Sequence, residues 1–145
     1  MKLRMVIADE KDDLDRALKI RSEVFVKEQG VPSHLDHDAD DDTSIHLLAY
    51  ADKELIGTGR LTWVPHSGWQ LARIAVIKPY RGLGIGRMII ENLEAIALSK
   101  KANRVFLRPH KHLQPFYEKL GYRLMNGEVI RIQNLELVIM EKHLN

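Results

Sequence analysis

The sequence predicts a mixed α/β fold in one domain. Segments with strand-like patterns and segments with helical periodicity follow one another along the chain, without an internal repeat or a low-complexity linker. The length of 145 residues lies near the commonest size of a single domain. With 45% hydrophobic and 29% charged residues, the chain has the apolar content that a globular core requires. We therefore expect residues 1–145 to form one domain.

The balance of charges and the lack of cysteine narrow the class of protein. The 22 basic and 20 acidic side chains leave a net charge of only +2, which does not suggest a nucleic-acid partner. No apolar run is long enough to span a bilayer, and the acidic residues after position 8 interrupt any signal-peptide core. The lack of cysteine excludes disulfides and suits a reducing compartment. We expect a cytoplasmic protein without a membrane partner.

The N-terminal segment is predicted to form a strand and a helix. Residues 3–8 form the strand, and a helix follows that is capped by Asp9 or Asp12 and ends near Phe25. Its core-facing stripe is expected to contain Leu14, Leu18, Arg21 and Phe25.

Residues 30–42 are predicted to form a loop, because they contain a proline and a run of aspartates. Alternate aspartates from Asp36 resemble the start of a calcium-binding EF-hand loop, but the sixth position is Asp41 instead of Gly and the twelfth is Leu47 instead of Glu. Two histidines of the loop lack a third firm ligand for zinc. We therefore predict no metal site and expect solvated carboxylates, which would attract a cationic amine substrate.

A hairpin is predicted next. Residues 45–51 and 54–64 are rich in apolar and β-favouring residues and flank two polar residues that suit a tight turn. Residues 65–68, with Pro and Gly, end this hairpin, and residues 70–77 are predicted to form a further strand.

The segment after Gly84 is predicted to form the clearest helix of the chain. Lys100 and Lys101 in its last turn suit the negative end of the helix dipole. The apolar residues that recur at helical spacing are Ile85, Met88, Ile89, Leu93 and Ile96.

The C-terminal third is predicted to contain two strands and one short helix. Residues 105–107 form a short strand and residues 135–142 the last strand. The helix covers residues 115–120, with Pro at its start and Gly121 as its stop signal.

Three alternating glycines join the strand at 70–77 to the long helix. Glycine lets the backbone approach a ligand and adopt positive φ, so that amides at the helix N-terminus can point at phosphate oxygens. The flanking Arg81 and Arg87 add charge-assisted hydrogen bonds, so we predict an anion site, although a purely structural turn has the same pattern. The P-loop is excluded because no Lys-Ser/Thr pair follows Gly86, and the dinucleotide fingerprint would need glycine at Arg87 or Ile89.

The pattern Arg-Gly-x-Gly-Ile-Gly at residues 81–86, after a strand that ends Ile-Ala-Val at 74–76, resembles the central motif of the GNAT superfamily of acyl-CoA-dependent N-acyltransferases. Residues 115–122, Pro-Phe-Tyr-Glu-Lys-Leu-Gly-Tyr, resemble a second superfamily motif. Residues 21–32 are similar to the small bacterial ElaA-like subgroup. Together these segments extend the resemblance over most of the chain.

The resemblance implies a GNAT-like bent mixed sheet of about six or seven strands flanked by about four helices, which is an α/β (α+β) fold. The strand at 74–76 would splay from its neighbour, so that its edge amides hold the pantetheine arm and the acetyl carbonyl of acetyl-CoA. The amides of residues 81–86 and the side chain of Arg87 would hold the pyrophosphate. The residues that the resemblance assigns to acetyl-CoA binding are Ile74, Ala75, Val76, Arg81, Gly82, Leu83, Gly84, Ile85, Gly86 and Arg87.

Tyr117 matches the tyrosine that superfamily members place beside the cofactor sulfur, where its hydroxyl can act as general acid. The alternative is a packing aromatic. Phe116 and Leu120 are four residues apart and make the expected core pair of this helix. Tyr117 is rotated about 100° from Phe116 and need not be buried with it.

The general base is predicted less directly. Many superfamily members have an acid on the strand before the glycine segment, whereas this chain has Arg73 there, so a water chain is one alternative. The side-chain candidates are Glu28, His110 and His112. The segment that contains Glu28 is expected to border the acceptor pocket, and each histidine could also be an ordinary surface residue.

The resemblance implies transfer of an acetyl group from acetyl-CoA, as cosubstrate, to a primary amine of a small-molecule or peptide acceptor. Direct attack is favoured over an acyl-enzyme, because no cysteine exists to carry the acyl group. The alternative is a catalytically silent acyl-CoA-binding or regulatory module on the same fold, and a nucleotide-dependent kinase is disfavoured by the missing Lys-Ser/Thr pair. Superfamily members pair as dimers through sheet edges or the C-terminal strand, so the resemblance also allows a homodimer.

Overall fold

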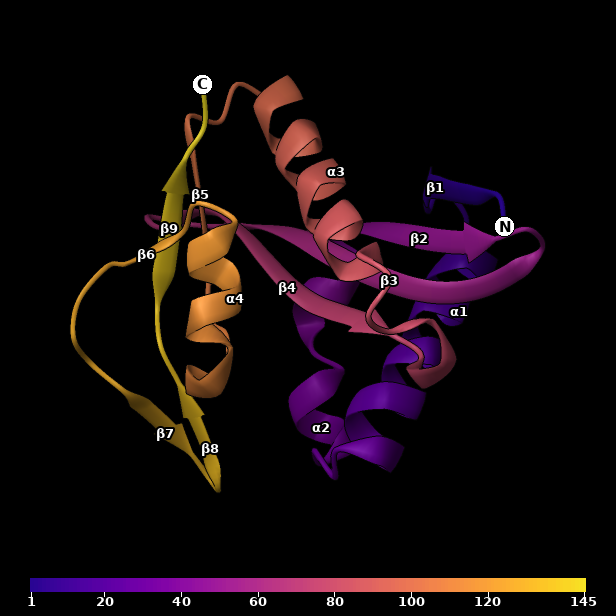
Figure 1. Cartoon of the computed structure of the whole chain (residues 1–145), viewed down its shortest axis with the longest axis horizontal. Helices are drawn as coiled ribbons and strands as arrows, with labels where there is room; N and C mark the ends of the chain where they lie inside the picture. The colour runs from indigo at the N-terminus through magenta and orange to yellow at the C-terminus, as the bar shows by residue number, and fades with distance from the viewer.

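A seven-stranded mixed sheet runs through the computed structural model, which describes residues 1–145 (Figure 1). The strand order is β1-β2-β3-β4-β5-β9-β6, and all neighbours are antiparallel except β4 and β5. This sheet confirms the predicted fold class. Its strands are β1 (Leu3–Ile7), β2 (Ile45–Ala51), β3 (Glu54–Val64), β4 (Gly68–Val76), β5 (Arg104–Leu107), β6 (Arg123–Leu124) and β9 (Met140–His143), and β7 (Ile130–Ile132) with β8 (Leu135–Leu137) forms a separate hairpin.

Helices cover both faces of the sheet. Figure 1 shows α3 (Ile85–Ser99) above the sheet and α1 (Lys11–Arg21) below it. No helix is both long and apolar enough to cross a membrane. The remaining helical segments are the π-helix η1 (Ser22–Glu28), α2 (Ser33–Asp36), α4 (Gln114–Lys119) and the 3₁₀ turns η2 (Ala39–Asp42), η3 (Lys78–Tyr80) and η4 (Lys111–Leu113).

Helix α3 packs against β3 at two glycines. A Cβ atom at Gly59 would lie only 2.7 Å from Cγ2 of Ile89, and one at Gly57 would lie 3.0 Å from Cδ1 of the same side chain. The apolar face of the helix is fully buried here, with Ile89 and Leu93 at 0% exposure. The predicted helix is therefore confirmed, and its first turn is held firmly over the sheet. Lys100 and Lys101 follow the last turn instead of lying in it.

The N-terminal helix differs from its prediction at both ends. It begins after Glu10, so neither predicted aspartate is the N-cap. Of the predicted stripe, Arg21 is fully buried and Leu14, Leu18 and Phe25 are partly buried. The fully buried positions of α1 are Ala17, Ile20 and Arg21. After Arg21 the chain widens into η1, which turns the following side chains away from the α-helical stripe and buries Val24 instead of Phe25.

A β-bulge bends β4 where it leaves β5. Thr58 pairs with Ala75 and Arg60 with Ala72, so Gly59 faces two residues of β4. One of these, Arg73, has a φ of +54°. Pairing between β4 and β5 stops after two residue pairs at Trp69 and Gln70, so residues 71–76 have no strand partner on that side. The splayed strand that the resemblance implied is confirmed.

The predicted last strand, 135–142, is two strands. Residues of β8 pair with β7 in the separate hairpin, whereas β9 pairs with β5 and β6 in the main sheet. Between β8 and β9, the N–H of Val138 donates to the carbonyl of Pro109 over 3.0 Å. This hydrogen bond holds the chain where it passes from the hairpin to the main sheet. The sequence did not predict β6 or β7, which are two and three residues long.

Candidate active site

The free edge of β4 borders a cavity of about 470 Å³. Ile74 and Leu71 of β4 line one side, and Leu107 and Tyr117 line the other. A wider groove of about 1050 Å³ shares residues with this cavity and runs past the start of α4. The cavity and the groove therefore adjoin each other beside the splayed strands.

The glycine segment forms an open row of backbone donors. Gly82 and Gly84 have φ values of +79° and +81°, and Gly84 is the N-cap of α3. No backbone carbonyl accepts a hydrogen bond from the six consecutive N–H groups of residues 82–87. A Cβ at Gly82, Gly84 or Gly86 would meet no atom within 4 Å, so the space in front of these glycines is open. This geometry suits a bound anion.

The two arginines that flank the glycines lie in different surroundings. Nε of Arg81 donates to the carbonyl of Val76 over 2.8 Å, and its terminal nitrogens bind both carboxylate oxygens of Glu28. The side chain of Arg87 is 63% exposed, with Nε 3.6 Å from Glu91. Arg87 is therefore the arginine that can turn toward an anion, while Arg81 fixes the end of β4 to η1.

Glu28 is placed poorly for a general base. Hydrogen bonds from Arg81 lower the pKa of this carboxyl group, which makes it a weaker proton acceptor. It also lines neither the cavity nor the groove, whereas the next residue, Gln29, lines both. Gln29 had no chemical signal in the sequence beyond its place in the ElaA-like segment.

Tyr117 lies in α4 with its ring against the core, at 8% exposure. Phe116 is 41% exposed, so the expected core pair of Phe116 and Leu120 was wrong. The rings of Phe116 and Tyr122 approach Tyr117 edge-on, with centroids at 5.0 and 5.8 Å. Burial raises the pKa of Tyr117 to about 12. The hydroxyl is therefore protonated at neutral pH, and the residue both packs in the core and lines the cavity.

His110 and His112 lie close together, His110 as the N-cap of η4 and His112 within it. Their ring centroids are 5.6 Å apart, and His110 forms an isolated β-bridge with Leu137. His110 lines both the cavity and the groove, whereas His112 lines only the groove. Burial, with a smaller contribution from His112, lowers the pKa of His110. The structure thus brings a neutral imidazole to the junction of the two openings.

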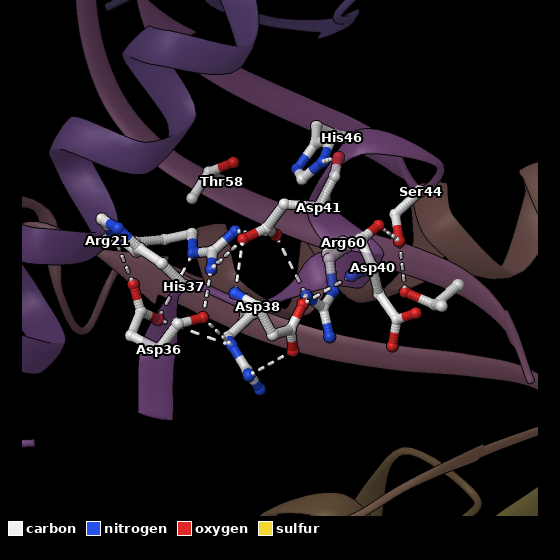
Figure 2. A network of polar contacts seen from close by, with 12 residues as sticks. Arg21, Asp36, His37, Asp38, Asp40, Asp41, Ser44, His46, Thr58 and Arg60 are labelled. Carbon is white, nitrogen blue, oxygen red and sulfur yellow. Dashed lines mark hydrogen bonds and ion pairs between the residues drawn. The ribbon is translucent and has the colours of Figure 1, made fainter. Parts of the chain in front are cut away.

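In the acidic segment, which lines one wall of the cavity, Asp36 and Asp41 are buried in a network of contacts with arginines (Figure 2), so the prediction of solvated carboxylates was wrong for these two. Asp36 is 2% exposed and Asp41 6%. Nη1 of Arg21 donates to Asp41 over 2.7 Å, and Nη1 of Arg60 donates to the same carboxylate over 3.0 Å. These buried arginines compensate the carboxylates that the sequence had suggested would need water. The signal in the sequence was Arg60, the one charged residue in the interior of β3.

Arg73 ties the bulge of β4 to the same wall. Its Nε donates to the carbonyl of Asp36 over 2.9 Å and its Nη2 to the carboxylate of Asp38 over 3.0 Å. Arg73, at a position where many superfamily members have an acid, therefore holds the acidic segment in place. No group of three His, Cys, Asp or Glu side chains has an arrangement that could hold a metal ion.

The chain is similar to several known proteins. The model of the acetyltransferase (GNAT) family matches residues 13–122. The uncharacterised N-acetyltransferase YjcF of Bacillus subtilis (strain 168) is 36% identical over 125 residues, which cover 86% of this chain and 88% of the relative.

Two solved structures share the fold over nearly their whole length. An acyl-CoA N-acyltransferase from Pseudomonas aeruginosa has a TM-score of 0.85 and 27% identity, and the match covers 97% of this chain and 99% of that one. Escherichia coli ElaA has a TM-score of 0.86 and 23% identity over the same shares of the two chains. The expected likeness to ElaA is thereby confirmed at the level of the fold.

Proposed function

This chain belongs to the GNAT family of acetyltransferases, and from this premise we propose that it transfers the acetyl group of acetyl-CoA to a primary amine. The observation that carries the proposal is the row of six N–H groups at residues 82–87 that have no backbone acceptor. Such a row at the N-terminus of a helix attracts phosphate through both hydrogen bonds and the helix dipole. It therefore fits the pyrophosphate of acetyl-CoA, and Arg87 would add a positive charge.

The free edge of β4 suits the remainder of the donor. Backbone groups of residues 74–76 that face away from β3 have no strand partner, and Ile74 lines the cavity together with Tyr117. We expect this edge to bind the amides of the pantetheine arm and the acetyl carbonyl, with the thioester near Tyr117. Acetyl-CoA would then supply the activated acetyl group at the junction of cavity and groove.

In the proposed reaction, the amine nitrogen bonds to the acetyl carbon while the carbon–sulfur bond breaks. The amine must lose a proton, and we assign this proton to His110, whose lowered pKa keeps the imidazole neutral at pH 7. His112, at the groove, would contact the substrates. Glu28 is assigned to holding Arg81 instead of accepting the proton.

The hydroxyl of Tyr117 is assigned to the departing thiolate. Its pKa of about 12 lies above the value of about 8.5 that is typical of a thiol. Complete proton transfer from the tyrosine would therefore be unfavourable, so the hydroxyl would stabilise the sulfur by donating a hydrogen bond. His110 would then pass the proton of the amine to the departing thiolate, so that coenzyme A leaves as the thiol and the imidazole is neutral again.

Two measurements test the proposed function. Release of coenzyme A thiol from acetyl-CoA, followed over a panel of primary amines, should depend on both substrates. Gly84→Glu should abolish acetyl-CoA binding in calorimetry, because it adds a charge and a side chain at a φ of +81°. Gly127→Glu is the matched control, since a Cβ there meets nothing within 4 Å.

The outcomes separate the two functions that the fold allows. Normal affinity in Gly84→Glu would mean that the donor site lies elsewhere. Binding of acetyl-CoA without thiol release for any amine would instead support the silent acyl-CoA-binding module.

A further inference from the structure

The acidic wall of the cavity has few charges to offer a substrate. Arg21 and Arg73 lie 3.3 and 3.5 Å from the carboxylate of Asp36. Arg60 and Arg73 bind Asp38 at 2.8 and 3.0 Å. The charges of these carboxylates are thus compensated within the chain, and Oδ2 of Asp36 is buried without a hydrogen-bond partner.

Two charged residues of the cavity lining form no ion pair, and their charges are opposite. Asp40 is exposed and its carboxylate has no ion pair, while Arg108 is exposed and its guanidinium has none. One negative and one positive group leave no net field that would favour a substrate with several positive charges. A polyamine or an aminoglycoside would lose hydration on entry and find one free carboxylate in return.

The rest of the lining is mainly apolar. Phe25, Val31 and Leu35 come from η1, the following turn and α2, whereas Leu135 and Leu137 come from β8 on the opposite side. The volume of about 470 Å³ lies within the range of sites for small ligands. Burial of an apolar group between these walls is worth about 25 cal/mol for each Å² removed from water.

Resting on the proposed acetyl transfer, which makes this cavity the acceptor site, we propose that the acceptor is a small monoamine with an apolar body. Its amino group would lie near His110 and Tyr117, and its body would fill the space between Leu35 and Leu135. This proposal replaces the expectation that the acidic segment attracts a cationic amine by its charge, because Arg21, Arg60 and Arg73 pair with Asp36, Asp38 and Asp41 and leave Asp40 as the one acidic lining residue without an ion pair.

The experiment measures binding to the full chain saturated with coenzyme A, so that no transfer is needed. Calorimetry with 2-phenylethylamine and with spermidine should give at least about tenfold tighter binding of 2-phenylethylamine, which corresponds to the burial of one aromatic group. Leu35→Ala should weaken its binding about fivefold or more, while the matched Leu98→Ala on the surface of α3 should leave it unchanged. Phe25→Ala provides a second variant if Leu35→Ala does not fold.

The results distinguish this inference from the proposed function. Equal affinities, tighter binding of spermidine, no binding of 2-phenylethylamine, or wild-type affinity in both cavity variants would overturn the apolar acceptor. If the amine binds as expected but acetyl-CoA releases no thiol in its presence, the cavity assignment stands and the proposed transferase activity fails.

Discussion

Two buried tyrosines lie side by side, and their hydroxyls differ in surroundings. The hydroxyl of Tyr122 donates to Glu94 over 2.7 Å, and burial, with the charge of Glu94, raises its pKa. Tyr117 instead lines the cavity, and burial alone raises its pKa to about 12. Tyr122 is therefore held as part of the core, whereas Tyr117 can act on a ligand.

Replacement of Tyr117 by Phe should separate chemistry from binding. The variant keeps the ring that packs against Tyr122 and loses only the proposed donor, so kcat should fall roughly 10²-fold while acetyl-CoA affinity stays unchanged. Steady-state kinetics and calorimetry measure the two quantities. Tyr122→Phe is the control, which should lower stability but retain turnover. Equal kcat for wild type and Tyr117→Phe would remove this residue from the mechanism.

The lowered pKa of His110 predicts how kcat/KM changes at acidic pH. Burial keeps the imidazole neutral to pH values below its ordinary 6.5, so the proposed base stays active there. A plot of kcat/KM should decline only below pH 6.5, as protonation removes the base. His110→Gln should lower kcat/KM and remove this limb, whereas His66→Gln in the turn before β4 should preserve it. A limb that persists in His110→Gln would assign the base elsewhere.

The pair of Glu28 and Arg81 predicts a defect in donor binding. Glu28→Gln removes the charge that holds Arg81, while Arg81 also donates to the last carbonyl of β4. Because the pair is partly exposed, the loss should be modest, about two- to fivefold in the Kd of acetyl-CoA, and smaller at high salt. Calorimetry at two ionic strengths measures it, with Glu23→Gln as control. A large fall in kcat with unchanged Kd would restore Glu28 as a general base.

Among the elements, α3 was predictable because one pattern dominates its sequence. Its apolar residues repeat at helical spacing, and glycines mark its start. The π-helix η1 was not predictable, because it continues an α-helix without a break in composition. Strand β8 was merged with β9, since pairing with β7 depends on contacts across the chain that periodicity does not contain.

The acidic wall was mispredicted because its partners lie far away in the sequence. Asp41 meets Arg21 from α1 and Arg60 from β3, at separations of 20 and 19 residues. Local composition alone describes seven residues of high charge and cannot show where the compensating arginines lie. Because an unpaired charge is costly to bury, the aspartate and its arginines are more stable buried together than buried separately.

The ion pairs of the acidic wall predict that the free energy of unfolding depends on pH. Burial by itself would raise the pKa of Asp41, but hydrogen bonds and charge from Arg21, with weaker help from Asp38 and Arg60, lower it to about 2. A carboxyl whose folded pKa is lowered stabilises the fold above its ordinary pKa of 3.8, and that stability is lost as the pH falls toward 2. Denaturant unfolding across this range should show the decline.

Asp41→Asn tests the same wall at neutral pH. It leaves Arg21 and Arg60 buried without the shared charge, so the free energy of unfolding should fall by about 3 kcal/mol. Asp42→Asn, at an exposed position next in the chain, should change it little. Equal stability of the two variants would mean that the wall does not depend on this carboxylate.

Over the whole molecule, the resemblance predicted what local patterns could not. Residues 81–86 follow β4, and residues 115–122 come after β5, far away in the sequence. The match to both motifs nevertheless implied that the sheet splays beside residues 74–76, as it does between β4 and β5. The proposed donor site could be predicted from these motifs because backbone amides would form it, and the spacing of the glycines reflects their geometry. The proposed acceptor cavity is lined by residues of η1, α2, β5 and β8 among other segments, so no single motif describes it.

A donor that binds along the opened sheet should stabilise the folded chain. At a concentration about 100 times its Kd, acetyl-CoA should add about 2.7 kcal/mol, which raises the Tm by roughly 5 to 10 °C for a chain of this size. Differential scanning calorimetry measures the shift, with Gly84→Glu as the variant that should show none. An unchanged Tm in the wild type at saturating acetyl-CoA would contradict the donor site.

The ion pairs of the acidic wall limit how acceptor specificity can be exchanged between related chains. The segment 22–44 carries one side of the cavity and both aspartates that Arg73 holds, but Arg60 and Arg73 belong to strands outside it. We expect a chimera that imports this segment from a relative to be destabilised unless the recipient supplies partners for its buried carboxylates, as Arg21, Arg60 and Arg73 do here. The segment and the arginines that pair with it would therefore have to be exchanged together.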